Sequence, residues 1–267
     1  MKRKTISKAK KTFFYCSLLM AAMLIMNAPC AAQLIDFIGS AKTSFSSLME
    51  TPVEFDEELR DYVAEGGSIH LEVYTADKIE KIVFSSIQIE ETGVSEESVF
   101  IYPDAGYEFP VFWANMTRMF GIINILIFDF MPLQDLVMTP SYGEEYMNPL
   151  YETKQQVMDE ILKKYTIKDK AYEFSSQAMY AYSPYRMIAQ VSFLGAIRIA
   201  DVVEAYSSTY LDLMEAAAEL DAGAQLDYAT EKHTALRELL QTNDPGYPFM
   251  VETFGEDITT RVMDVIF

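Results

Sequence analysis

FIYPDAGYEFPVFWANMTRMFGIINILIFDFMPL, residues 100–133, is rich in β-branched and aromatic residues and is interrupted by turn residues near Asp104 and at Gly121. This composition and punctuation predict short strands joined by hairpins. The same pattern extends toward the N-terminus as far as residue 68. Consecutive hairpins leave no room for crossover helices, so the strands should be antiparallel. We expect four or five of them, at about 68–74, 79–90, 98–102, 109–118 and 122–130.

Helical periodicity dominates the chain after these strands. Residues 141–165, 224–243 and 258–267 read as helices, and residues 176–223 read as a loop, with Pro184 in it, that leads into a long helix. Before the strands, residues 33–49 and 54–66 read as two short helices. Strands followed by helices predict an α+β fold, a three-layer α/β/α sandwich whose central antiparallel sheet is flanked by helices. We expect one domain, residues 33–267.

The first 32 residues differ from the rest of the chain. A basic start, MKRKTISKAKK, precedes an apolar segment and the small residues CAAQ, as in a secretory-type leader cleaved near Ala32. The alternative is an uncleaved membrane anchor, because the apolar length approaches the roughly 20 residues that span a bilayer. Any membrane contact is expected through this leader alone.

Charge and cysteine content exclude several classes of function. The 21 Lys and Arg and 40 Asp and Glu give a net charge of −19. Six of the basic residues lie in the leader, so the remaining chain has 15 Lys and Arg against 40 acids, a net charge of −25. A chain of this charge would repel nucleic acid. The acidic residues need have no specific function, because a solvated acidic surface that keeps the protein soluble would explain them equally. Both cysteines, Cys16 and Cys30, lie in the leader, which excludes disulfides and thiolate chemistry from the mature chain.

The familiar cofactor and hydrolase motifs are absent from the sequence, including the glycine-rich nucleotide loops and the zinc-binding HExxH. With only two histidines, His70 and His233, no multi-histidine metal site can be built, and a structural or surface role is expected for each.

Residues 100–133 resemble the central hairpin of the ferredoxin-dependent bilin reductases. The positions that fit this pattern are Tyr102, Pro103, Tyr107, Glu108, Pro110, Phe112, Ala114, Asp129, Pro132 and Leu133. Three later segments are similar to other family elements and keep the family order: EEYMNPLYE (144–152), SPYRMIAQVS (183–192) and NDPGYPFMVETFGEDITTRVMDVIF (243–267).

The resemblance implies a protein that holds biliverdin IXα, or a reduced relative, between the sheet and the C-terminal helices. It implies no bound cofactor or metal: reduced ferredoxin donates single electrons, and side chains supply protons to the bilin. The implied enzyme is an oxidoreductase acting on CH–CH groups that yields a phytobilin such as phytochromobilin. The alternative is a noncatalytic bilin-binding relative. Which double bond is reduced stays open.

The resemblance also assigns roles to individual residues. Asp244 matches the family's C-terminal catalytic Asp, and burial beside an apolar ring system would keep it protonated. Asn115 stands where many members have an Asp. An Asn at this position is similar to the branch of the family that forms phytochromobilin. An amide can hold a pyrrole lactam but does not readily donate a proton. Glu90 matches an acidic residue at a strand end and is the candidate for a second proton-handling group. The alternatives are structural roles for Asn115 and Asp244 and a solvent-facing turn acid for Glu90.

Substrate contacts are implied for four further residues. Ser98 occupies a position where some members have His, and Phe112 lies on the hairpin pattern. Gln190 stands where the family usually has an Arg that binds a propionate, and Arg186 is its expected substitute. We expect a monomer, in a plastid reached through the secretory-type leader; the thylakoid lumen or secretion are the alternatives.

Overall fold

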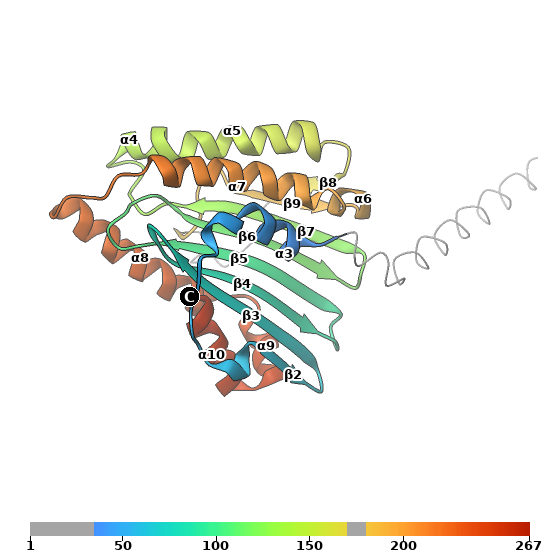
Figure 1. Ribbon diagram of the computed structural model, residues 1–267. Helices are drawn as coiled ribbons and strands as arrows, with labels where there is room; N and C mark the ends of the chain where they lie inside the picture. Colours follow the sequence, from blue (N-terminus) through green and yellow to red (C-terminus); the bar gives the residue numbers. More distant parts are fainter. Residues whose placement is uncertain (1–34, 170–179) are drawn as a thin grey trace, which may run out of the picture. The chain divides into compact units, whose positions relative to one another are not determined.

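The computed structural model describes residues 35–169 and 180–267. Its centre is a nine-stranded antiparallel sheet in the order β1-β3-β4-β5-β6-β7-β9-β8, with β2 paired to β3 as well (Figure 1). The strands are β1 (Thr51–Pro52), β2 (Asp61–Ala64), β3 (Gly67–Ala76), β4 (Ile79–Ile89), β5 (Val94–Pro103), β6 (Val111–Met119), β7 (Ile123–Met131), β8 (Thr166–Asp169) and β9 (Met187–Val191). The five strands expected from the sequence are β3 to β7, each paired with the next.

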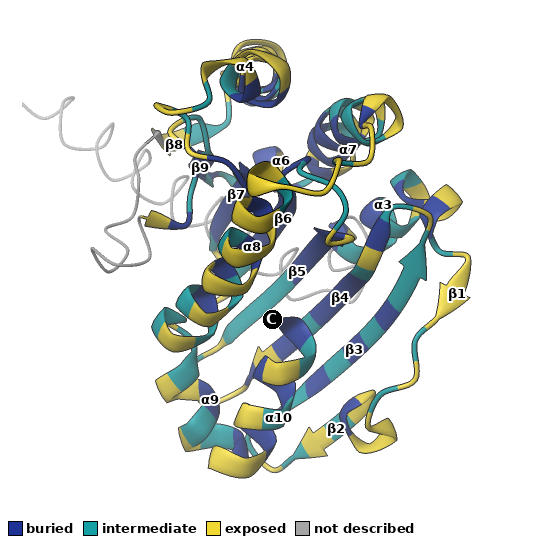
Figure 2. Cartoon of the chain, turned by 90° about the vertical axis from the view of Figure 1, so that its left-hand side faces the viewer, coloured by how far each residue is buried: buried dark blue, intermediate teal, exposed yellow. Residues whose placement is uncertain are grey.

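Helices cover both faces of this sheet. On one side lie α3 (Phe37–Ser44) and α7 (Ile199–Ala216), which contact each other; we call this side the α3/α7 face. On the other side, the α8–α10 face, lie α8 (Ala224–Asn243), α9 (Tyr247–Phe254) and α10 (Glu256–Ile266) (Figures 1 and 2). The expected α/β/α sandwich is therefore confirmed.

The remaining helical segments are short or irregular. A run of α-helical and π-helical turns packs against α7, and α6 follows β9. These segments are η1 (Ser46–Leu48), η2 (Glu57–Leu59), α4 (Pro140–Tyr142), η3 (Gly143–Met147), α5 (Asn148–Gln156), η4 (Val157–Ile161) and α6 (Phe193–Ala196).

Two local expectations are wrong. Residues 54–66 do not form a helix: after the single turn η2, residues 61–64 pair with β3, and their exposure alternates with the period of a strand. Strand β9 lies within residues 176–223, for which the sequence predicts a loop that leads into a long helix and no strand. It lies between β7 and β8, and its strand character comes from this long-range pairing rather than from local sequence.

Residues 37–267 form one compact unit. The expected leader, residues 1–32, lies outside the described residues, so the division of the chain at Ala32 stays a prediction.

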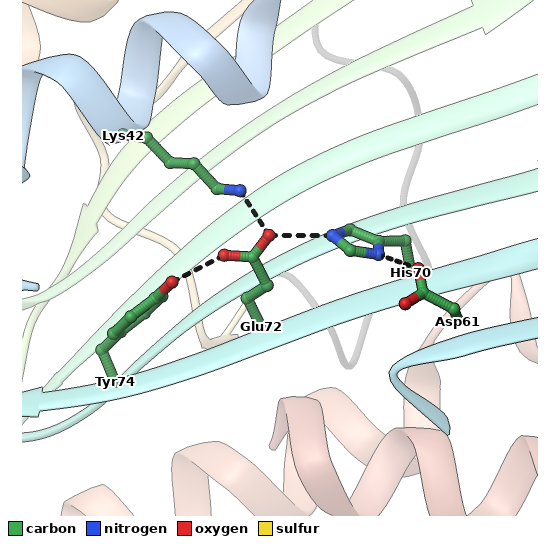
Figure 3. Close-up of polar contacts among 5 residues, drawn as sticks. All are labelled: Lys42, Asp61, His70, Glu72 and Tyr74. Atoms are coloured by element: carbon green, nitrogen blue, oxygen red, sulfur yellow. Dashed lines mark hydrogen bonds and ion pairs between the residues drawn. The ribbon is translucent and has the colours of Figure 1, made fainter. Parts of the chain in front are cut away.

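A chain of polar side chains on the α3/α7 face ties α3 to the edge of the sheet (Figure 3). His70 Nδ1 lies 2.6 Å from Asp61 Oδ1, and its Nε2 lies 2.9 Å from Glu72 Oε1. Glu72 also accepts hydrogen bonds from Lys42 Nζ at 2.5 Å and from the Tyr74 hydroxyl at 2.7 Å. Both ring nitrogens of His70 face carboxylate oxygens, so the imidazolium form satisfies both contacts.

This polar chain predicts a pH-dependent contribution to stability. Burial lowers the pKa of His70, but hydrogen bonds to Glu72 and Asp61 outweigh it and raise the pKa above its ordinary value. The contribution is fully present below the unfolded pKa of about 6.5 and is lost as the pH rises through the raised folded pKa. We expect His70→Gln to lower the free energy of unfolding more at pH 6 than at pH 9, measured by urea unfolding. An equal loss at both pH values would contradict this.

Candidate functional site

A cavity of about 530 Å³ lies on the α8–α10 face, within the range of roughly 300–1,000 Å³ typical of small-molecule sites. Its floor is made by alternate residues of the four central strands: Ser85, Ile87 and Ile89 of β4, Val94, Glu96, Ser98 and Phe100 of β5, Trp113, Asn115, Thr117 and Met119 of β6, and Ile125 and Ile127 of β7. The opposite wall comes from α8, α9, α10 and the turn between α8 and α9. The cavity is therefore mostly apolar, with a few polar groups at defined places.

Asp244 lies on the helical wall of the cavity, in the turn that follows α8. Its Oδ1 accepts a hydrogen bond of 2.6 Å from the Gly246 N–H, which fixes the carboxyl in the turn. Burial raises the pKa of Asp244, although backbone hydrogen bonds from Gly246 and Tyr247 oppose this. The sequence placed this carboxyl correctly in the turn, and the structure directs it to the cavity.

Asn115 lies on the cavity floor, together with an acid that the sequence interpretation overlooked. Asn115 Nδ2 donates a hydrogen bond of 2.7 Å to Glu96 Oε1, and the Thr117 hydroxyl donates to Asn115 Oδ1 at 2.9 Å. Ser98, also buried on the floor, lies with its Oγ 2.6 Å from Ser85 Oγ. The alternation of β5 could have revealed Glu96, because it shares a face with Ser98.

Glu96 faces Asp244 closely enough for the two charges to interact. Burial and the charge of Asp244 raise the pKa of Glu96 to about 7, and the hydrogen bond from Asn115 opposes the shift. Two carboxyls that repel each other in an apolar cavity favour at least one protonated form near neutral pH. Such a pair can hold and deliver protons.

Two expected site residues lie elsewhere. Glu90 is exposed in the turn after β4, where its N–H donates to Gly66 O at 2.9 Å, and it is not among the residues that line the cavity. Phe112 is fully buried on the α3/α7 face, because its neighbours Val111 and Trp113 take the opposite side of strand β6. The expected proton-handling role of Glu90 and the expected substrate contact of Phe112 are corrected accordingly.

The two candidates for binding a propionate lie beside the cavity rather than in its lining. Arg186 donates from Nη1 to Ser183 O at 3.0 Å, and its guanidinium lies 5.7 Å from the Tyr182 ring centroid. Gln190 of β9 is opposite Ile125 in the register, so its side chain is on the cavity side of the sheet.

An aromatic stack forms one part of the cavity wall. The Trp113 ring lies between those of Phe100 and Tyr182, with centroid distances of 5.8 Å and 5.2 Å and interplanar angles of 13° and 16°. Parallel rings of this kind present flat faces and edges to a planar ligand.

Asp129 anchors the loop that carries Tyr182. It is fully buried and accepts hydrogen bonds from both the backbone N–H and the hydroxyl of Ser183. Burial raises the pKa of Asp129 to about 7, against the hydrogen bonds from Ser183 and the charge of Arg186. This carboxyl therefore holds the loop against the end of β7.

In residues 35–169 and 180–267, no group of three or more His, Cys, Asp or Glu is arranged to hold a metal ion. Within the same residues, no helix has both the length and the apolar character needed to span a bilayer. That the protein holds no bound cofactor stays a prediction.

Comparison with protein families decides the identity of the chain. Residues 40–267 match the profile described as ferredoxin-dependent bilin reductase. The chain belongs to the ferredoxin-dependent bilin reductase family. The family is one of oxidoreductases, and membership confirms the resemblance read from the hairpin and the C-terminal segment.

Solved structures show the same fold. The crystal structure of phytochromobilin synthase from tomato in complex with biliverdin matches with a TM-score of 0.70 and 17% sequence identity. The match covers 84% of this chain and 78% of that one. At this identity the likeness shows that the two proteins share a fold. Comparison with curated proteins found no match.

Proposed function

We propose that this bilin reductase reduces one carbon–carbon double bond of biliverdin IXα, or of a dihydrobiliverdin, with electrons from reduced ferredoxin. The observation that carries the proposal is the position of Asp244, a half-buried carboxyl with a raised pKa on the wall of an apolar cavity of about 530 Å³. A double bond takes up two electrons and two protons, and Asp244 supplies one of these protons as general acid.

Several features of the cavity support a linear tetrapyrrole as the ligand. The apolar floor and the stacked rings of Trp113 and Tyr182 offer flat surfaces to pyrrole rings. Asn115 provides an amide on the floor that can hold a pyrrole lactam. The amide at this position favours a product of the phytochromobilin type. The tomato protein of the same fold is described in complex with biliverdin.

The proposed setting is a plastid reached through a secretory-type leader. Its support is the basic and apolar composition of residues 1–32. Ferredoxin would be the electron source there, and simple export would leave the enzyme without a donor.

The reaction can be followed by absorption spectroscopy. Protein without residues 1–32 is mixed with biliverdin, and then with ferredoxin and a system that keeps it reduced. We expect a spectral shift on binding and then a new spectrum of a reduced bilin. A bound biliverdin that stays unchanged under reducing conditions would support the noncatalytic alternative, and no shift on mixing would contradict both.

A further inference from the structure

Glu96 is a carboxyl that lines the cavity, and within residues 35–169 and 180–267 no Lys, Arg or His forms an ion pair with it. In the described part of the chain, Arg118 forms an ion pair with the adjacent Glu97 on the α3/α7 face, whereas Glu96 forms none. In the part of the chain that the structure describes, the side-chain hydrogen bond that holds Glu96 comes from Asn115, at 2.7 Å. An ionised carboxyl that is removed from water and has no cation beside it destabilises the folded state. A purely structural role therefore does not explain an acid at this position.

The amide of Asn115 has a fixed orientation. Because the Thr117 hydroxyl donates to Asn115 Oδ1, the NH₂ group of Asn115 is turned toward Glu96. Toward Glu96, Asn115 therefore acts as a donor and not as an acceptor. Its hydrogen bond occupies Oε1 of Glu96, and Oε2 is left to carry a proton. The arrangement holds a protonated carboxyl in one position on the floor of the cavity.

We propose that Glu96 is the second proton donor of the reduction, with Asn115 as its positioning residue. This inference rests on the proposed function and assigns the proton that Asp244 does not supply. Asp244 lies on the helical wall and Glu96 on the sheet, so the two carboxyls reach the bilin from different sides. The pair replaces the arrangement expected from sequence, in which Glu90 had this role.

The balance of the step is simple. Reduced ferredoxin supplies two electrons, one at a time, to the bilin. Asp244 and Glu96 each release one proton from a carboxyl oxygen, and the two protons form two new C–H bonds. The π bond between the two carbons is lost, and each carboxylate regains a proton from water.

The test is Glu96→Gln, whose amide oxygen can still accept the hydrogen bond from Asn115. We expect biliverdin to bind with an unchanged affinity and the turnover under excess reduced ferredoxin to fall about a hundredfold. A one-electron-reduced bilin should accumulate and give an electron paramagnetic resonance signal, because the electron arrives while the second proton does not. If the Gln variant does not fold, Glu96→Leu removes the carboxyl without burying another polar group.

Glu97→Gln is the matched control. It removes the same charge from the next residue of β5, on the opposite face of the sheet, and should leave turnover within about twofold because Glu97 is not among the residues that line the cavity. Turnover at the wild-type level in Glu96→Gln or Glu96→Leu would overturn the proposal, and so would a loss of biliverdin binding instead of turnover. Failure of the wild-type protein to bind or reduce biliverdin would overturn the proposed function itself.

Discussion

The Asp244→Asn variant is expected to bind biliverdin as the wild type does and to reduce it about a thousandfold more slowly. Asn has nearly the same shape as Asp, and its side-chain oxygen can accept the N–H of Gly246, which now donates to Asp244 at 2.6 Å. The turn after α8 should therefore keep its conformation. What the variant lacks is the proton.

The pH dependence of the wild-type rate should follow from the same carboxyl. Burial raises the pKa of Asp244, so its protonated form persists to a higher pH than that of an ordinary aspartic acid. A general acid must be protonated to act, so the rate should fall as the pH rises through this raised pKa. The residual rate of Asp244→Asn should lose the contribution of Asp244 to this pH dependence and keep the fall that Glu96, the proposed second proton donor, imposes.

Turnover is measured with saturating reduced ferredoxin, and binding from the biliverdin absorption spectrum. Asp221→Asn makes the same substitution at an exposed position before α8 and should leave both unchanged. A rate in Asp244→Asn that equals the wild-type rate would remove Asp244 from the proton-transfer step.

The parts of the site that the sequence predicted well are those governed by local structure. Asp244 lies in a turn with the sequence Asp-Pro-Gly, which is typical of turns. Helices α8 and α10 begin and end close to the residues expected from the sequence. Asn115 and Ser98 lie opposite each other in neighbouring strands, so one hairpin register brings both to the cavity. Hairpin register depends on nearby residues, which a sequence shows directly.

The predictions that were wrong depend on which face of a strand a residue occupies, or on pairing with strands that are distant in the sequence. Phe112 is three residues before Asn115, so the two side chains take opposite faces of β6, and Trp113 has the cavity position instead. Glu90 is one residue beyond the end of β4, where the turn directs it to solvent. Strand β9, which carries Gln190, exists through its pairing with β7 and β8, and no local pattern marks it.

A second large effect is expected on stability, from Phe112→Ala. The Phe112 ring is fully buried among aromatic side chains of the α3/α7 face, with ring centroids 5.1 Å from both Phe45 and Tyr210 and 5.8 Å from Phe130. Truncation of such a ring leaves a cavity that the packed neighbours cannot fill, at a cost of about 3–5 kcal/mol. This is a large fraction of the roughly 5–15 kcal/mol that stabilises a typical domain.

The same variant separates packing from ligand binding. Because Phe112 lies across the sheet from the cavity, the folded fraction of Phe112→Ala should bind biliverdin with the wild-type affinity. Phe249→Ala is the matched opposite: Phe249 lines the cavity and its side chain is 53% exposed, so we expect weaker biliverdin binding and a loss of at most about 1 kcal/mol. Urea unfolding gives the stabilities and absorption titration the affinities. If Phe112→Ala weakened binding while stability was unchanged, Phe112 would be a substrate contact after all, and the cavity would lie on the wrong face of the sheet.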